Sequence, residues 1–237
     1  MKFDKKQTVI WAAVALAALS AVFLPYPISD IVIYVSGMVA CFALAKHLGI
    51  QNEGVKPKFW TALTVSLPAF AIAVNNFPWV AYFTEKPQLV IDQKFALTVA
   101  LCLACAAFEE TMFRYLVMHL IMDKKRYNYI VGILLCGAIF GAYHILNIFF
   151  GASVGYTLLQ VTYTTLIGSM LCVVYDKTKR LWICVLIHFV YNVGGDSVNL
   201  LGIKEQWVMP EVLLTVAVSV LVLVFYVVCV LKDRKKS

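Results

Sequence analysis

The chain has 237 residues, of which 62% are hydrophobic and only 14% are charged. Soluble domains average about 45–50% apolar and about 25% charged residues, so this composition excludes an ordinary soluble protein. The formal net charge of +7 is compatible with an anionic partner such as nucleic acid, but the placement of the basic residues along the chain does not favour one.

Apolar segments long enough to cross a bilayer, which takes about 20 residues each, recur along the whole chain. In chain order they cover residues 8–25, 29–48, 59–81, 95–121, 128–150, 155–175, 181–201 and 209–231. The first is longer than the apolar core of a signal peptide, about 7–15 residues, so we expect an uncleaved helix there. No connection is long enough for a soluble domain. The sequence therefore predicts that residues 1–237 form a single integral-membrane domain, an all-α polytopic bundle of about eight transmembrane helices.

The basic residues alternate between the connections in a way that predicts an orientation. If the N-terminus is cytosolic, 16 of the 20 Lys and Arg fall in cytosolic segments, as the positive-inside rule expects. They are Lys2, Lys5, Lys6, Lys46, Lys56, Lys58, Lys124, Lys125, Arg126, Lys177, Lys179, Arg180, Lys232, Arg234, Lys235 and Lys236. The outer connections hold only Lys86, Lys94 and Lys204. We therefore expect both termini in the cytosol, with the lipid bilayer as the partner that explains the positive charge.

The cysteines give no sign of a disulfide framework. There are seven, an odd number, and all fall within predicted helices. Cys102 and Cys105 form a CxxC pair, but no second pair accompanies them. They are interpreted as small packing residues.

Ionisable groups within membrane helices are costly, so they mark candidate functional sites. His47 and His119 lie near helix ends and are interpreted as interface residues. The deep residues are Glu109, Glu110, Arg114, His144 and His188, with Asp196 nearer the outer surface and with Asn147 and Asn192 as uncharged polar neighbours.

Helical spacing divides the acidic pair. Glu110 and Arg114 are four residues apart and share a helix face, which predicts a structural ion pair. Glu109 is rotated by about 100° and has no expected partner in its own helix. A buried carboxylate of this kind, or one held by a group on another helix, suits a general base.

The other polar residues lie on two later helices. His144 is followed a turn later by Asn147. His188 and Asn192 are four apart, so both can face one cavity. Two histidines, an unpaired Glu and an Asn on three helices can activate a water and donate hydrogen bonds to a developing oxyanion.

These residues occur in an order that resembles a known family, the CPBP intramembrane proteases, which include the CAAX-prenyl-protease-2-like and bacteriocin-processing (Abi) proteins. The resemblance covers about residues 97–200, and each of its motifs lies on a separate predicted helix. The motifs EExxxR, FxxxH and HxxxN correspond to Glu109-Glu110-x-x-x-Arg114, Phe140-x-x-x-His144 and His188-x-x-x-Asn192.

The resemblance implies an intramembrane endopeptidase that acts on membrane-associated peptides or proteins. By this resemblance, Glu109 and His144 activate the attacking water, while His188 and Asn192 stabilise the oxyanion. By the same resemblance, structural support of the site comes from Glu110, Arg114 and Phe140. The short loops and small size resemble a bacterial member, which places the protein in the bacterial plasma membrane.

The sequence favours no metal and no other cofactor. There is no HExxH motif, and zinc would need Glu109, His144 and His188 to converge from three helices. Glutamate-dependent, metal-free hydrolysis is therefore the preferred interpretation, with zinc as the alternative.

Other functions fit less well. An aspartyl protease would need Asp176 and Asp196 together, but in the predicted topology they lie about 22 Å apart along the helix axis. Gly168-Ser169 does not supply the GxSG of a rhomboid-like serine protease. The matching halves expected of a transporter are absent. A membrane scaffold or bacteriocin-immunity protein on the same fold is the main alternative, because a fold does not fix a function.

Overall fold

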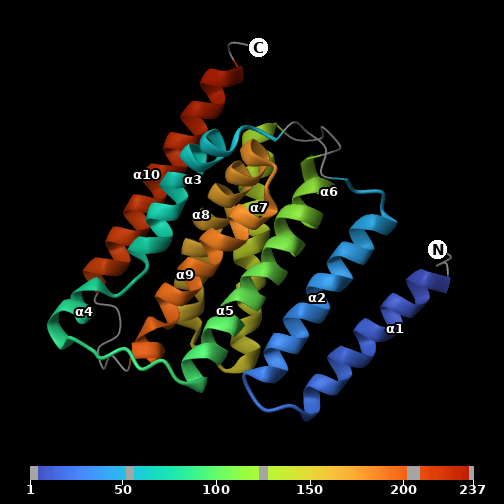
Figure 1. The fold of residues 1–237 in the computed structure, drawn as a ribbon. Helices are drawn as coiled ribbons and strands as arrows, with labels where there is room; N and C mark the ends of the chain where they lie inside the picture. The colour runs from blue at the N-terminus through green and yellow to red at the C-terminus, as the bar shows by residue number, and fades with distance from the viewer. Residues whose placement is uncertain (1–4, 52–55, 123–127, 202–208, 235–237) are drawn as a thin grey trace.

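The computed structural model describes residues 5–51, 56–122, 128–201 and 209–234, and within these ranges the chain is helical without β-strands (Figure 1). Several of the basic residues used to predict the orientation lie outside the described ranges, namely Lys2, Lys124, Lys125, Arg126, Lys204, Lys235 and Lys236. The elements are α1 (Lys5–Ser20), η1 (Ala21–Phe23), α2 (Ile28–His47), α3 (Phe59–Asn75), α4 (Trp79–Glu85), α5 (Gln93–Glu110), η2 (Thr111–Val117), α6 (Met118–Met122), α7 (Tyr129–Tyr143), η3 (His144–Phe150), α8 (Val154–Thr178), α9 (Leu181–Leu201) and α10 (Met209–Arg234).

Five helical segments of the described chain are long and apolar enough to cross a membrane: 28–47, 93–122, 129–150, 154–178 and 213–232. A sixth results if α3 and α4, which meet at 46°, are one bent span. The first and seventh predicted segments correspond to shorter apolar helices, Thr8–Phe23 and Leu181–Ser197. The all-helical membrane bundle is thus confirmed. The described residues contain five or six candidate spans, and the count of about eight stays a prediction.

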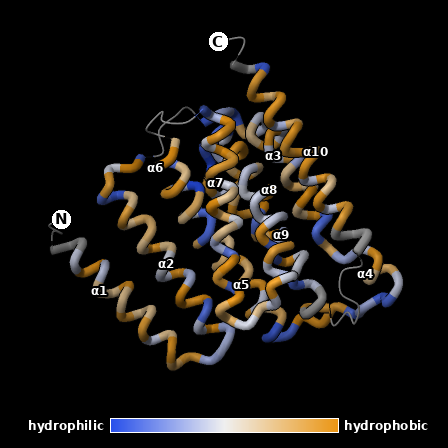
Figure 2. Tube along the Cα trace, turned by 180° about the vertical axis from the view of Figure 1, so that it is seen from behind, coloured by the Kyte–Doolittle hydropathy of each residue, from blue (hydrophilic) through white to orange (hydrophobic). Residues whose placement is uncertain are grey.

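The surface of the bundle fits a lipid environment. Large apolar side chains are exposed along its outer helices, among them Leu16, Leu67 and Leu221. Figure 2 shows hydrophobic residues running along α1, α2 and α10. Exposed apolar surface of this extent marks a membrane or a partner, and the helices keep their backbone hydrogen bonds internal, as a bilayer requires.

The most buried of the candidate spans is α8, which packs against α7, α3, α9 and α10. Leu171, Cys172 and Val174 on this helix are fully buried. In contrast, α1 packs mainly against α2 at the edge of the bundle.

Glycines allow α7 to approach α8 closely. A Cβ on Gly137 would lie 2.6 Å from the Thr165 carbonyl oxygen, and one on Gly141 would lie 2.7 Å from the Val161 carbonyl oxygen. Small residues four apart commonly bring membrane helices together in this way. The contact holds the C-terminal end of α7 against α8, and Phe140 and His144 lie at that end.

Two helices that carry site residues, α5 and α7, begin at local sequence signals. Asp92 begins α5 by accepting a hydrogen bond from the Phe95 amide at 2.8 Å, and Asn128 begins α7 by accepting one from the Ile130 amide at 3.0 Å, as N-cap residues do.

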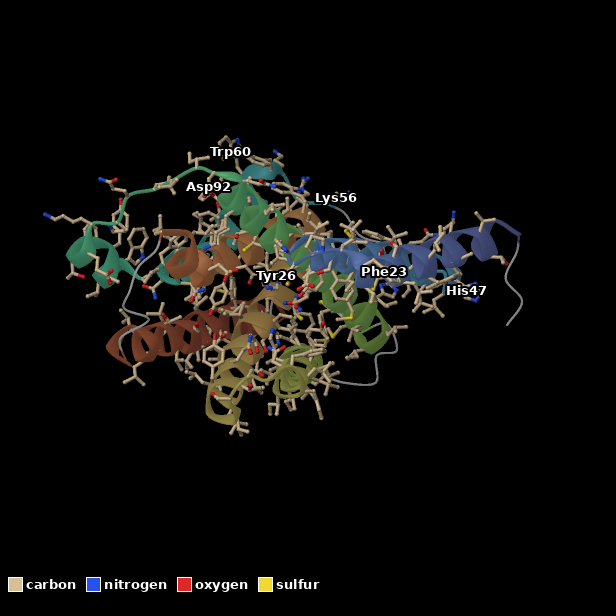
Figure 3. The ribbon with its side chains drawn as sticks, turned by 90° about the horizontal axis from the view of Figure 1, so that it is seen from below. Phe23, Tyr26, His47, Lys56, Trp60 and Asp92 are labelled. Atoms are coloured by element: carbon tan, nitrogen blue, oxygen red, sulfur yellow. The ribbon has the colours of Figure 1, made fainter. Side chains whose placement is uncertain are left out.

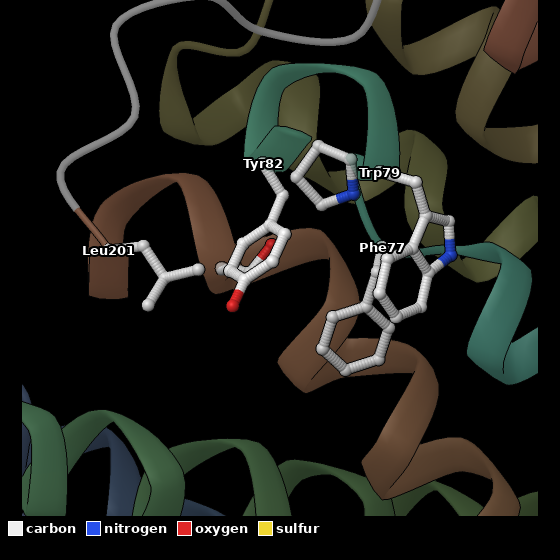
Figure 4. Close-up of a pocket in the computed structure, with 6 residues that line it drawn as sticks. Phe77, Trp79, Tyr82 and Leu201 are labelled. Carbon is white, nitrogen blue, oxygen red and sulfur yellow. The ribbon is translucent and has the colours of Figure 1, made fainter. Parts of the chain in front are cut away.

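At the lower end of the bundle, Phe77, Trp79 and Tyr82 line a small apolar pocket against Leu201 of α9 (Figure 4).

Candidate active site

The two adjacent glutamates lie where α5 passes into η2, a π-helical turn. Glu110 and Arg114 are completely buried, and their Oε2 and Nε atoms are 3.0 Å apart. Glu109 is 6% exposed. Single π-helical turns inside α-helices frequently occur at functional sites, and Arg114 lies within this one.

His188 on α9 contacts both glutamates. Its Nδ1 lies 2.9 Å from Glu110 Oε1, in a hydrogen bond to the carboxylate. Its Nε2 lies 3.6 Å from Glu109 Oε2. The ion pair of Glu110 with Arg114 therefore continues into a hydrogen bond that fixes the orientation of the His188 ring.

His144 lies at the junction of α7 and η3. Its Nδ1 is 3.0 Å from the carbonyl oxygen of Phe140, one turn earlier, and this hydrogen bond sets the ring orientation. The predicted helix over 128–150 changes here from α-helix to 3₁₀-helix. Residues three apart are eclipsed in a 3₁₀-helix, which places Asn147 on the same side as His144.

Phe140 packs against the charged and ring groups of the site. The Arg114 guanidinium carbon lies 4.6 Å from the centre of its ring, in a cation–π arrangement. The His144 and His188 rings approach it edge to face, with centroids 5.1 and 5.8 Å away. A Phe at this position thus holds three polar side chains in place without competing for their hydrogen bonds.

A cavity of about 580 Å³ brings the predicted residues together. Glu109, His144, His188 and Asn192 all line it, as does Asn147. Glu110 and Arg114 do not. Of the two glutamates, only Glu109 is therefore placed to meet a molecule in the cavity.

Two features of the site differ from the sequence-based interpretation. Glu109 does have a partner in its own helix, because the Cys105 thiol donates to its Oε1 at 3.6 Å. Cys102 and Cys105 are more than packing residues, since both line the cavity and the Cys102 thiol donates to Asp196 at 3.3 Å. The contact of Cys105 with Glu109 joins residues four apart on one helix. The contact of Cys102 with Asp196 joins α5 to α9, so it could not be foreseen without knowing which helices are neighbours.

The cavity also contains polar residues that the sequence analysis did not single out. Asn76 donates to the Tyr191 carbonyl oxygen at 2.7 Å, and Gln160 accepts from Asn147 at 2.8 Å. The available signal was their polarity within apolar runs. His47 and His119 do not line the cavity.

Asp176 also lies outside the cavity. Its carboxylate accepts hydrogen bonds from Tyr129 and Lys179. Asp196, in contrast, lines the cavity.

The possible zinc ligands do not fit a metal site in their present arrangement. The Nδ1 atoms of His188 and His144 are engaged in hydrogen bonds with Glu110 and a backbone carbonyl oxygen, so zinc would have to bind their Nε2 atoms. No group of three or more His, Cys, Asp or Glu side chains in the described parts of the chain is arranged to hold a metal ion.

The comparison with family models agrees with this geometry. Residues 91–194 match the model described as type II CAAX prenyl endopeptidase Rce1-like. The match contains all three motifs, overlaps the predicted 97–200 core, and supports the resemblance to the CPBP family. This part of the chain is similar to the Rce1-like family, which supports a CAAX-protease type of membrane protein. No curated protein and no solved structure matches the chain.

Proposed function

We propose that the protein is an intramembrane endopeptidase that hydrolyses peptide bonds through a water activated by Glu109 and His144. The observation that carries the proposal is the shared cavity, to which α5, the α7–η3 junction and α9 contribute Glu109, His144, His188 and Asn192. A carboxylate, two imidazoles and an amide around one space provide a base and hydrogen-bond donors for acyl transfer.

In the proposed reaction, Glu109 accepts a proton from water while His144 orients that water. The resulting hydroxide attacks the peptide carbonyl carbon, and the carbonyl oxygen becomes an oxyanion. The C–N bond then breaks, and the proton passes to the leaving amine. This sequence needs one base that also returns the proton, which a carboxylate in a mostly apolar cavity can do.

His188 and Asn192 are the proposed donors to the oxyanion. Because Nδ1–H of His188 is held by Glu110, donation from Nε2 requires the doubly protonated ring. Glu110, with Arg114 behind it, would therefore act as a positioning residue for His188.

The proposal extends to the setting of the reaction. The substrate is a membrane-associated peptide or protein, and no metal or other cofactor takes part. The bundle crosses the membrane about eight times, with both termini in the cytosol of a bacterial cell. The apolar outer surface of the helices supports the membrane location.

Replacement of Glu109 tests the function. In membranes from cells carrying Glu109→Gln, peptides that accumulate with the native protein should be missing, and the purified variant should show no cleavage, because the amide keeps the shape of the side chain but accepts no proton. Glu85→Gln is the matched control: the same change on the exposed end of α4, outside the cavity, should leave the rate unchanged.

Asn192→Ala should retain measurable cleavage at a rate about 100–1,000-fold lower, as expected for the loss of one oxyanion donor. Full activity in Glu109→Gln would refute the catalytic assignment. A cellular phenotype that persists in Glu109→Ala would favour the scaffold or immunity function instead. Zinc chelation should not change the native rate, and stoichiometric zinc lost together with activity would contradict the metal-free mechanism.

A further inference from the structure

A second carboxylate, that of Asp196, lies in the same cavity, about one helical turn beyond Asn192 and two beyond His188. His188, Asn192 and Asp196 are spaced by four residues along α9, and all line the cavity. Glu109 and Cys102 line it from α5, which packs against α9 and runs in the opposite direction (Figure 1). The cavity therefore extends along this helix pair, from Glu109 and His188 to Cys102 and Asp196.

Among the described residues, Asp196 has little compensation for its charge. Its hydrogen bond with the Cys102 thiol, 3.3 Å from Oδ2, uses a weak donor, whereas an ionised carboxylate can accept about four hydrogen bonds. No Lys or Arg is among the described residues that line the cavity. Carboxylates within membrane proteins usually pair with a cation or serve a ligand pathway.

The connection between η1 and α2 lies close to this end of the cavity. Tyr26 lies in this connection and is labelled in Figure 3, which looks at the bundle from below. Partial burial raises the pKa of the Tyr26 phenol most, and the negative charges of Asp196 and Asp30 raise this pKa further. The charge of Asp196 therefore acts at the lower end of the bundle, with a second carboxylate, that of Asp30, nearby.

We infer that Asp196 forms an acidic subsite that binds a cationic group of the substrate, a lysine or arginine side chain or a free amino group. The eight residues from His188 to Asp196 span about 12 Å of helix, which matches about three to four residues of extended peptide. The cation should therefore lie about three to four residues from the bond that is cleaved. This inference rests on the proposed function and adds the substrate class to it.

A peptide library measures this preference. The peptides are apolar 12-residue sequences with acetylated N-termini, each with one lysine or, in the paired peptide, glutamine at the same position. A lysine-free peptide with a free N-terminus tests whether a terminal amino group can bind in place of a lysine side chain. The purified full-length protein in detergent is incubated with each set, binding is measured by fluorescence anisotropy, and cleavage products are identified by mass spectrometry.

The native protein should cleave and bind the lysine peptides about tenfold better than their glutamine partners, as expected for one charge-assisted hydrogen bond, with lysine at a fixed distance from the cut. Asp196→Asn should remove this ratio but retain cleavage of the glutamine peptides. Asp196→Lys should reverse the preference towards glutamate peptides. Asp176→Asn, which removes a carboxylate outside the cavity, should behave like the native protein.

The outcomes separate the inference from the proposed function. An unchanged lysine ratio in Asp196→Asn, with cleavage still abolished by Glu109→Gln, overturns the subsite and leaves the protease intact. Equal cleavage in the native protein and Glu109→Gln overturns the proposed function. In that case, binding still tests the subsite. If lysine peptides bind equally well to the native protein and to Asp196→Asn, the subsite is overturned as well.

Discussion

Arg114 shows how a charge is accommodated in the interior of this bundle. Its side chain is fully buried, its Nε lies 3.0 Å from Glu110, and its guanidinium carbon lies over the Phe140 ring. Its Nη1 and Nη2 atoms make no hydrogen bond to the described residues. Compensation of the charge therefore depends on one carboxylate and one aromatic face.

Arg114→Ala should consequently reduce the amount of folded protein. The change leaves Glu110 buried with only His188 as a partner, and breaking a buried ion pair by removal of one member costs about 3–5 kcal/mol. Thermal unfolding in detergent, together with the yield of monodisperse protein, measures the effect. Lys179→Ala is the control, because the pair of Lys179 with Asp176 is partly exposed and pairs of that kind contribute about 0–1 kcal/mol. Normal thermal stability of Arg114→Ala would argue against a structural role for the pair.

At the scale of the helices, the contact between α7 and α8 sets the position of His144. Gly141 lies three residues before His144, and its Cα faces the backbone of α8, where the nearest carbonyl oxygen belongs to Val161. A backbone atom cannot rotate away as a side chain can. Any added methyl group must therefore push the two helices apart.

Gly141→Ala should destabilise the protein by about 1–3 kcal/mol, the usual range for overpacking, and should lower the cleavage rate by displacing His144. Gly155→Ala offers a matched control on α8, since a Cβ there would have no atom within 4 Å. Thermal unfolding and the cleavage rate are measured for both variants. Equal stability of the two variants would show that the close contact does not matter.

The helices also show what a sequence of this type can predict. Long apolar runs locate most of the elements, because a membrane helix needs a continuous apolar stretch. The π-helical turn after Glu110, the 3₁₀-helix from His144 and the bend between α3 and α4 are not visible in these runs. They depend on tertiary contacts, and apolar residues face both lipid and neighbouring helices, so the buried face of a helix cannot be identified from hydropathy.

The candidate site was predictable only where its residues lie on the same helix. Spacing by four residues correctly paired Glu110 with Arg114 and placed His188 and Asn192 at one cavity. Spacing along one helix carries no information about the neighbouring helix. The contacts of His188 with Glu110 and of Cys102 with Asp196 join α9 to α5, so they required the structure.

At the scale of the whole molecule, successive helices run up and down through the bundle (Figure 1). The start of α3 lies at the upper end and the start of α5 at the lower end. Exposed lysines lie beside both starts, Lys58 before α3 and Lys94 within the first turn of α5. These two lysines form a matched pair for a test of the orientation.

We expect the end of the bundle at which α3 starts to face the cytosol, and we expect both termini and the connections near 50–58, 123–127 and 176–180 to lie in the cytosol, because 16 of the 20 basic residues then lie inside. Lys94→Cys should react with a membrane-impermeant thiol reagent in intact cells. Lys58→Cys and Lys125→Cys, the latter outside the described residues, should react only after the membrane is permeabilised. The native protein gives the background from its seven cysteines, four of which are buried and three partly buried. Labelling of Lys58→Cys or Lys125→Cys in intact cells, with Lys94→Cys protected, would reverse the orientation and place the acidic subsite at the cytosolic end of the cavity.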